Sequence, residues 1–530
     1  MYLKGLYLSA LLSVIGIGAI ACTAEKPKVE VEEKTPEIVV YQKTLIPLDS
    51  LTVLAFFNTY PNLKKYESEV MKLYKKHNFT QVWNDGEGTI EFGNTLFTKY
   101  KNIETEGIKA TFPYEEQLNS IFDDGIENTL SQADTDLMIT SLFMFYEEKV
   151  VKGIDEKTTK SLEWLLPRKE VSYAAILDST LLHPEAFNKD TRVMIDQYYK
   201  LRDVLQQYRS IEKNGGWNKI DLDPKLKEYK VGDTAAAILQ IKERLFVTGD
   251  LKENNKINKF DAELLAAVNK YQVRNGKLVS QTISPKLIEE MNVPISDRIK
   301  TIMVNMERCR WMSPDIKDAR EYLLVNIPAY RLTFVRDNKV ALTSPVVVGK
   351  TMTKTVIFSG KMTNVVFSPY WNVPQSIINK EVKPGMAKNS NYLASHNMEW
   401  NGGNVRQKPG ERNSLGLVKF IFPNSNNIYL HDTPSKSLFE KEDRAFSHGC
   451  VRVGKPRDLA IAILAEDPNW TPEKIDAAMH KGVEYSYPLK NKIPVYIGYF
   501  TSWVNDEGTI MFYDDIYKRD DRLAKLLFTE

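Results

Sequence analysis

The chain has 530 residues, of which 43% are hydrophobic, so it is long enough for roughly two to four domains with sizeable cores. Its 71 Lys and Arg residues nearly balance its 69 Asp and Glu residues, and the formal net charge is +2 at pH 7. This balance gives no electrostatic reason for binding nucleic acid, and we expect no nucleic-acid partner.

The N-terminal stretch is typical of an export signal. Lys4 precedes an uncharged run, residues 5–21, that is shorter than the ~20 residues a membrane span needs. The run leads into Ala19-Ile20-Ala21-Cys22, which resembles a bacterial lipoprotein cleavage box. On this resemblance residues 1–22 are a signal peptide, and Cys22 becomes the lipidated first residue of the mature protein. An ordinary signal peptide cut near Ala21, or an uncleaved anchor, is the alternative.

The next two segments are a tether and a helical region. Residues 23–45 are rich in charge and proline and poor in core-forming residues, which predicts an extended tether. Over residues 46–224 apolar residues recur at steps of three and four, as in Leu63, Tyr66, Val70 and Leu73. This period predicts a helical domain. No cluster of candidate catalytic residues lies in it.

Residues 225–297 predict a small bundle of three short helices. Their apolar positions are Ile238, Ile241 and Leu245, then Leu264, Val268 and Tyr271, then Leu287, Ile288 and Met291. The sequences Val231-Gly232-Asp233-Thr234 and Ala267-Val268-Asn269-Lys270-Tyr271-Gln272 are similar to those of peptidoglycan-binding domains. That similarity implies a peptidoglycan-binding-like module, and a purely structural spacer is the alternative.

Residues 298–530 predict a helix followed by a β-rich domain. β-branched and aromatic residues fill residues 322–327, 331–335 and 340–342, and residues 336–339 predict a turn. The aromatic insertion at residues 367–412 is long for a connector, so we expect a functional lid. Simple packing of its aromatic residues against another domain is the alternative.

Two alternating segments carry the residues with reactive side chains. If residues 447–453 form one strand, His448, Cys450 and Arg452 share one face of it. Residues 428–432 alternate in the same way and turn Tyr429 and His431 outward. Two half-buried strands would therefore each present a histidine, and one of them also presents the thiol of Cys450.

This set of groups fits nucleophilic catalysis by a cysteine. A cysteine attacks as its thiolate, and either His431 or His448 could be the base that removes its proton. The amides of Gly449 and Cys450 could stabilise an oxyanion, since a glycine lets the backbone approach a substrate closely. Arg452 could stabilise the thiolate or hold a substrate carboxylate.

Two simpler interpretations compete with catalysis. Cys450 could be a small buried hydrophobic residue, with both histidines structural. A zinc site could use Cys450, His431 and His448, but the sequence offers no fourth ligand or catalytic carboxylate at a recognisable spacing. We therefore expect no metal and no cofactor. We also expect Cys309 to be buried and free, because a disulfide with Cys450 would silence the nucleophile.

The two reactive segments together resemble a known catalytic domain. Tyr429-Leu430-His431-Asp432-Thr433-Pro434 and Ser447-His448-Gly449-Cys450-Val451-Arg452 are similar to the L,D-transpeptidase catalytic domain of the YkuD type. The resemblance implies that Cys450 is the nucleophile, that His431 is its general base, and that the amides of His448, Gly449 and Cys450 form the oxyanion hole. Tyr429, Arg452 and Ser447 would position the donor substrate.

Other parts of the chain resemble the larger, YcbB-like members of that family. Residues 46–224 are similar to their scaffold domain, and Ser368-Pro369-Tyr370-Trp371-Asn372-Val373-Pro374 is similar to their capping subdomain. Trp371 would then cover the groove above Cys450. The expected fold class is multidomain α+β: the helical scaffold, the small three-helix bundle, and a β-sandwich-like catalytic domain over residues 298–530 with an inserted cap.

The resemblance also implies a reaction and a location. The enzyme would form 3-3 crosslinks in peptidoglycan, from a donor tetrapeptide stem to an amine on a neighbouring stem, and would be a carbapenem target that serves cell wall biogenesis and cell shape. It would be a periplasmic lipoprotein, held in the outer membrane of a Gram-negative bacterium through Cys22. The alternatives are an L,D-carboxypeptidase or D-amino-acid exchange enzyme with the same acyl-enzyme, and a non-catalytic wall-binding lipoprotein.

Overall fold

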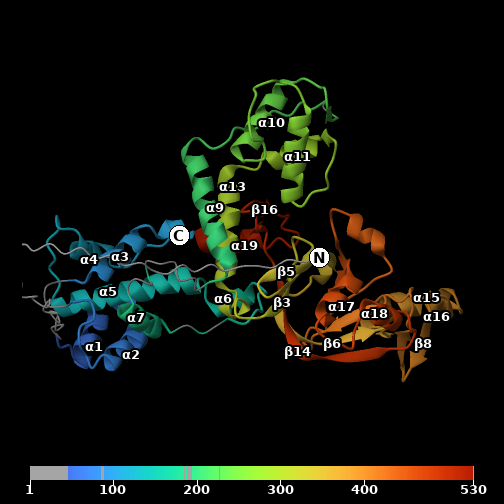
Figure 1. The fold of residues 1–530 in the computed structure, drawn as a ribbon. Coiled ribbons are helices and arrows are strands. Elements are labelled where there is room, and N and C mark those ends of the chain that lie inside the picture. Colours follow the sequence, from blue (N-terminus) through green and yellow to red (C-terminus); the bar gives the residue numbers. More distant parts are fainter. Residues whose placement is uncertain are drawn as a thin grey trace, which may run out of the picture. The chain divides into compact units, whose positions relative to one another are not determined.

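The computed structural model describes residues 46–84, 89–168, 170, 172–183, 187, 194–225 and 227–528 (Figure 1). The predicted signal peptide, the tether and Cys22 lie outside the described residues. Within these ranges no helix is both long enough and apolar enough to cross a membrane. The multidomain α+β class is confirmed: helices dominate the first half of the described chain and a large mixed sheet dominates the second.

Helices form the region expected to be a scaffold. They are α1 (Ser50–Thr59), α2 (Glu67–Lys76), α3 (Glu91–Lys101), α4 (Glu115–Phe122), α5 (Gln132–Glu147), α6 (Glu156–Ser161), α7 (Tyr173–Leu182) and α9 (Asp196–Lys213). Helix α5 is the central element, because every residue from Asp136 to Glu147 is buried. The Asp136 carboxylate accepts hydrogen bonds from the backbone of Val82 (3.1 Å) and Trp83 (2.7 Å). These bonds tie the irregular segment that contains Val82 and Trp83 to α5, and they satisfy the buried amides of both residues.

Helix α13 (Ile295–Arg310) joins the scaffold to the sheet. It packs along α9, and the two helices lie side by side (Figure 1). The buried Arg310 guanidinium donates to the carbonyl oxygens of Glu106 (2.6 Å) and Val150 (2.9 Å). Cys309, on the same helix, is fully buried and unpaired, which confirms the prediction.

The predicted small bundle has its own core. It consists of α10 (Ala236–Val247), α11 (Ala262–Arg274) and α12 (Pro285–Met291), with a short ladder between β1 (Tyr229–Lys230) and β2 (Thr282–Ile283). A buried ion pair, Arg274 with Asp250, adds two hydrogen bonds of 2.6 and 2.7 Å. Lys277 reaches Asp514 at 2.9 Å, which links the bundle to the chain beyond the sheet.

The large sheet closes on itself. Its strands are β3 (Glu321–Asn326), β4 (Arg331–Arg336), β5 (Lys339–Gly349), β6 (Phe358–Phe367), β10 (Val418–Ile421), β11 (Leu430–His431), β12 (Ala445–Ser447), β13 (Val451–Val453) and β14 (Tyr485–Gly498). The order is β12-β5-β13-β11-β10-β6-β14-β3-β4, and β4 also pairs with β5. The two expected layers thus belong to one continuous hydrogen-bonded sheet. Helices α17 (Pro456–Leu464), α18 (Pro472–Met479) and α19 (Asp520–Phe528) follow or interrupt its last strands.

The insertion between β6 and β10 has a small core of its own. A separate sheet has the order β7-β9-β8, with β7 at Trp371–Asn372, β9 at Asn404–Gln407 and β8 at Met398–Asn401. Short helices α14 (Gln375–Ile377), α15 (Lys383–Lys388) and α16 (Tyr392–Ser395) pack beside it. The buried centre consists of Val373, Ile378, Val382 and Val405. An insertion with its own core holds a defined shape, as a lid requires.

Candidate active site

The two reactive segments meet on neighbouring strands. β11 and β13 run parallel, with Leu430 opposite Val451 and His431 opposite Arg452. The Val451 amide donates to the Tyr429 carbonyl at 3.2 Å. The structure therefore brings together the segment that carries Tyr429 and His431 and the segment that carries Cys450 and Arg452.

Residues 447–453 are not one strand, and that expectation was wrong. β12 ends at Ser447, a bend occupies residues 448–450, and β13 begins at Val451. β12 runs parallel to β5, whereas β13 runs antiparallel to it. The chain reverses at Gly449, whose φ of +120° is strained for residues with a Cβ. Cys450 therefore lies in a bend between two strands.

Two hydroxyl groups, those of Ser447 and Thr355, hold the bend in place. Ser447 is buried, and its Oγ donates to the Cys450 carbonyl (2.6 Å) and accepts from the Gly449 amide (3.1 Å). The Thr355 hydroxyl donates to the Gly449 carbonyl at 2.8 Å. Because the Gly449 amide already donates to Ser447, the amides of His448 and Cys450 are the predicted oxyanion donors that have no hydrogen-bond partner in the described chain. The role predicted for Ser447 toward substrate stays a prediction.

The Cys450 thiol is half-buried. Its Sγ lies 3.7 Å from the Asn427 carbonyl oxygen, a contact that the sequence did not indicate. Burial raises the pKa of Cys450, while hydrogen bonds from Tyr429 and the positive charge of Arg452 act in the opposite direction. The balance favours the protonated thiol at neutral pH, so the thiol needs a base when it attacks.

His431 is buried and neutral. Burial, and then the positive charge of Arg452, lower the pKa of His431 to about 3. Its Nδ1 lies in hydrogen-bond contact with the Asp432 carbonyl oxygen, which can only accept, so Nδ1 carries the proton. Nε2 is then the atom that can accept a proton, as a general base requires.

Asp432 is a supporting residue that the sequence did not identify. Its carboxylate accepts from the amides of Thr433 (2.7 Å) and Leu417 (2.9 Å) and pairs with Lys436. Gly416 lies against it so closely that a Cβ there would come within 2.3 Å of the carboxylate. These contacts fix the backbone whose carbonyl orients the His431 ring.

Tyr429 connects the thiol to the insertion. Its side chain lies near Cys450 and Trp371, and burial raises the pKa of Tyr429 above its usual value. Its ring meets the His431 ring edge-on, with centroids 5.7 Å apart. Trp371, at the start of the insertion, therefore lies next to a residue that contacts the thiol, and its role as a cover stays a prediction.

The second histidine faces the insertion. The His448 side chain is 53% exposed, and its Nε2 lies 3.7 Å from a carboxylate oxygen of Glu381. Glu381 belongs to the turn of helix between α14 and α15. Of the two candidate bases, His431 is the buried one with an oriented ring. In the described part of the chain no group of three or more His, Cys, Asp or Glu side chains is placed to hold a metal ion.

The raised pKa of Cys450 predicts how the thiol responds to pH. Alkylation by iodoacetamide should increase steadily with pH and reach half its maximum above the pH of ~8.5 that a free cysteine needs. Arg452→Gln should move this midpoint higher still, since a positive charge that favours the thiolate is lost. The measurement is the alkylation rate by intact mass, with Cys450→Ala as the unlabelled control. A plateau already present at pH 7 would contradict this picture.

Comparison with protein families and known proteins identifies two parts of the chain. Residues 320–475 match the L,D-transpeptidase catalytic domain of the YkuD family, and residues 68–205 match the scaffold domain. A Haemophilus influenzae protein named as an L,D-transpeptidase is 34% identical over 249 residues, which are 43% of this chain and 50% of that protein. The chain thus spans about half the length of this relative.

Solved structures of similar proteins carry the same name. An L,D-transpeptidase from Mycobacterium smegmatis matches 34% of this chain and 59% of its own, with 14% identity and a TM-score of 0.19. An L,D-transpeptidase from Stackebrandtia nassauensis matches 53% of this chain and 96% of its own, with 15% identity and a TM-score of 0.21.

The family matches and the site agree in position. The matched catalytic region contains β11, β13 and the bend that holds Cys450, and the matched scaffold region lies within residues 46–224. The chain therefore carries a YkuD-type L,D-transpeptidase catalytic domain behind a scaffold domain.

Proposed function

We propose that the protein is a cysteine-dependent L,D-transpeptidase that forms 3-3 crosslinks in peptidoglycan through a thioester on Cys450. The observation that carries the proposal is the contact between strands β11 and β13. His431, a neutral imidazole whose Nε2 can accept a proton, is paired there with Arg452. The half-buried thiol of Cys450 directly precedes the same strand pair. The position of this contact inside the matched catalytic domain supports the same chemistry.

In the first half-reaction His431 acts as base and then as acid. Nε2 accepts the thiol proton as Sγ bonds to the carbonyl carbon of the third stem residue. The bond from that carbon to the nitrogen of the terminal D-alanine breaks, and His431 returns the proton to the leaving amine. The amides of His448 and Cys450 would donate to the oxyanion once substrate is bound, joined by Gly449 if Ser447 releases its amide.

In the second half-reaction an amine on a neighbouring stem attacks the thioester. His431 removes a proton from that amine, the carbon–sulfur bond breaks, and the thiol is restored. Arg452 and Tyr429 would position the donor stem, and Trp371 with its insertion would cover the groove. Water or a free D-amino acid in place of the amine would give the carboxypeptidase or exchange activity.

The proposed location follows from the N-terminal sequence. An export signal with Cys22 as lipidation site would place the enzyme in the periplasm on a tether, within reach of the wall. Labelling cells with a clickable fatty acid tests this proposal. Label on the wild-type protein and its absence from a Cys22→Ala variant are expected.

The product of the reaction tests the function directly. Purified protein incubated with disaccharide-tetrapeptide should yield crosslinked dimers that have lost one terminal D-alanine per bond formed, seen by liquid chromatography and mass spectrometry. Tripeptide monomers alone would indicate a carboxypeptidase, and incorporation of an added D-amino acid would indicate exchange. No product from the wild-type protein, with sacculus binding unaffected by Cys450→Ala, would instead support a non-catalytic wall-binding lipoprotein.

A further inference from the structure

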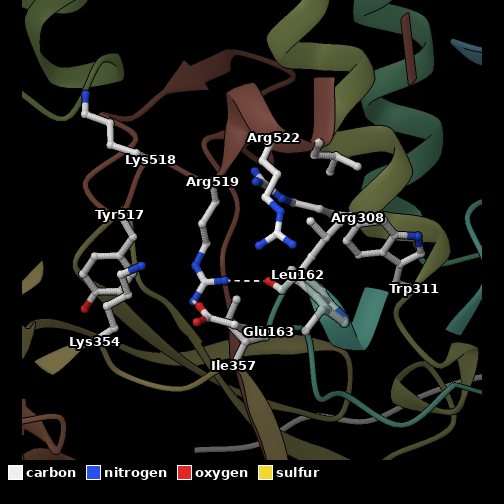
Figure 2. Close-up of a pocket in the computed structure, with 12 residues that line it drawn as sticks. Leu162, Glu163, Arg308, Trp311, Lys354, Ile357, Tyr517, Lys518, Arg519 and Arg522 are labelled. Carbon is white, nitrogen blue, oxygen red and sulfur yellow. Dashed lines mark hydrogen bonds and ion pairs between the residues drawn. The ribbon is translucent and has the colours of Figure 1, made fainter. Parts of the chain in front are cut away.

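A basic cavity whose lining does not include Cys450 lies where the scaffold meets the segment around α19. It has a volume of about 100 Å³, well above the ~10–15 Å³ that one water needs. Its walls come from the segment after α6, from the end of α13, from the segment before β6, and from α19 together with the residues that precede it. Figure 2 shows the guanidinium groups of Arg519 and Arg522 turned toward the same space as Arg308, with Leu162 and Glu163 opposite.

The charges around this cavity are unbalanced. Among the described residues that line it, five are cationic and one is a carboxylate: Arg308, Lys354, Lys518, Arg519, Arg522 and Glu163. Arg308 is paired with Asp520, and Arg519 with Glu163, each at 2.7 Å. For Arg522, Lys354 and Lys518 the described chain contains no ion-pair partner. Like charges gathered around a cavity repel one another unless an anion lies between them.

Two buried hydrogen-bond donors at this cavity also lack acceptors. The Trp164 side chain is 2% exposed, and within the described chain its Nε1 has no hydrogen-bond partner. The Nε of Arg519 is likewise buried without an acceptor in the described residues, although another nitrogen of this guanidinium donates to the Leu162 carbonyl at 2.7 Å. Buried donors in folded proteins are nearly always satisfied, so each calls for an acceptor.

We propose that this cavity is a binding site for a phosphate group. A carboxylate is planar and is satisfied by one two-pronged guanidinium. Phosphate carries more charge and presents oxygens in several directions, which fits a lining with donors on Trp164, Arg519 and Arg522. The excess of cations also matches a dianion better than a single negative charge.

The cavity is coupled to the bend that holds the nucleophile. Lys354, which lines it, stands between Thr353 and Thr355, whose hydroxyls donate to the carbonyls of Ser447 (3.0 Å) and Gly449 (2.8 Å). Tyr517, also in the lining, donates to the Gly349 carbonyl at 2.6 Å and accepts from the Thr355 amide at 3.1 Å. A bound phosphate would therefore stabilise the backbone that supports the Cys450 bend from behind.

Equilibrium dialysis of the full chain against radiolabelled inorganic phosphate tests the site, at an ionic strength held constant with chloride. We expect saturable binding of one phosphate per chain. Arg522→Ala should weaken it about tenfold or more, because a charge-assisted hydrogen bond is lost. Trp164→Phe keeps a similar ring but removes the Nε1 donor, and should weaken it several-fold. Circular dichroism of both variants checks that they fold.

Arg412→Ala is the matched control, because Arg412 is exposed, lies outside the cavity lining and has no ion pair within the described residues. It should bind phosphate as the wild type does. Binding that does not saturate, or an equal affinity in the wild type and folded Arg522→Ala, would overturn the proposal. Displacement by glycerol 3-phosphate would identify a phosphate ester as an accepted form of the ligand, and failure to displace would identify free phosphate. Neither result depends on transpeptidase activity.

Discussion

Cys450→Ala is expected to abolish covalent labelling by a carbapenem, an acylating mimic of the donor, and to leave the fold intact. The wild-type protein should gain one adduct per chain by intact mass, and crosslinking should fall at least ~10³-fold in the variant. Cys309 cannot take over as the nucleophile, because it is fully buried and burial raises the pKa of its thiol far above the usual range. The half-buried Sγ of Cys450 lies 3.7 Å from the Asn427 carbonyl oxygen, a long and weak contact, so its removal should cost little stability.

The control for this experiment is Cys309, the other described cysteine, which lies on α13. Cys309→Ala should retain the adduct, since the labelled thiol is unchanged, although it leaves a small gap in the packing of α13. Equal near-UV circular dichroism for the wild type and Cys450→Ala would confirm that folding is preserved. An adduct that persists on the Cys450→Ala chain would refute the nucleophile assignment.

The parts of the fold that were predictable are those set by local chemistry. Apolar residues at helical spacing led to α2, α5 and the helices of the small bundle. Asp337 and Asn338 predicted the turn between β4 and β5, and both adopt positive φ values of 49° and 58°, as a tight hairpin turn requires. The buried, unpaired state of Cys309 followed from the need to keep Cys450 reduced.

The parts that escaped prediction depend on contacts between distant segments. The alternation of residues 447–453 suggested one strand, but β12 and β13 pair with β5 in opposite directions, and Gly449 reverses the chain between them. Alternation of side chains cannot reveal such a reversal, because the two valines are buried in either case. Gly449, directly before the candidate nucleophile, is the one local signal, and it is compatible with close approach to a substrate as well as with a bend.

The contacts around the site could not be predicted from the sequence either. The contact of Sγ with the Asn427 carbonyl and the placement of Gly416 against Asp432 join residues from separate turns. The basic cavity brings Trp164 and Arg522 together across more than 350 residues of sequence. Tertiary packing alone creates such sites, and no periodicity in the chain marks them.

His431→Ala should slow acylation of Cys450 by about 10²–10⁴-fold, the range typical for loss of a general base. The thiol has a raised pKa, so without an acceptor at Nε2 few molecules carry the thiolate at neutral pH. The measurement is the rate of carbapenem acylation by stopped-flow absorbance. The deficit of the variant should shrink as pH rises, because hydroxide then ionises the thiol without the imidazole.

The comparison with the second histidine decides between the two candidate bases. His448→Ala should change the acylation rate by less than about threefold, because its exposed side chain contacts Glu381 and contributes only its backbone amide to the proposed mechanism. The acylation rate of the wild type on the acidic side of its pH profile supplies a further check. Since burial holds the pKa of His431 near 3, wild-type acylation should show no loss of activity at pH 6.5, where an ordinary histidine would be half protonated. A His448→Ala deficit as large as that of His431→Ala, or a wild-type acid limb centred at pH 6.5, would assign the base to the exposed histidine instead.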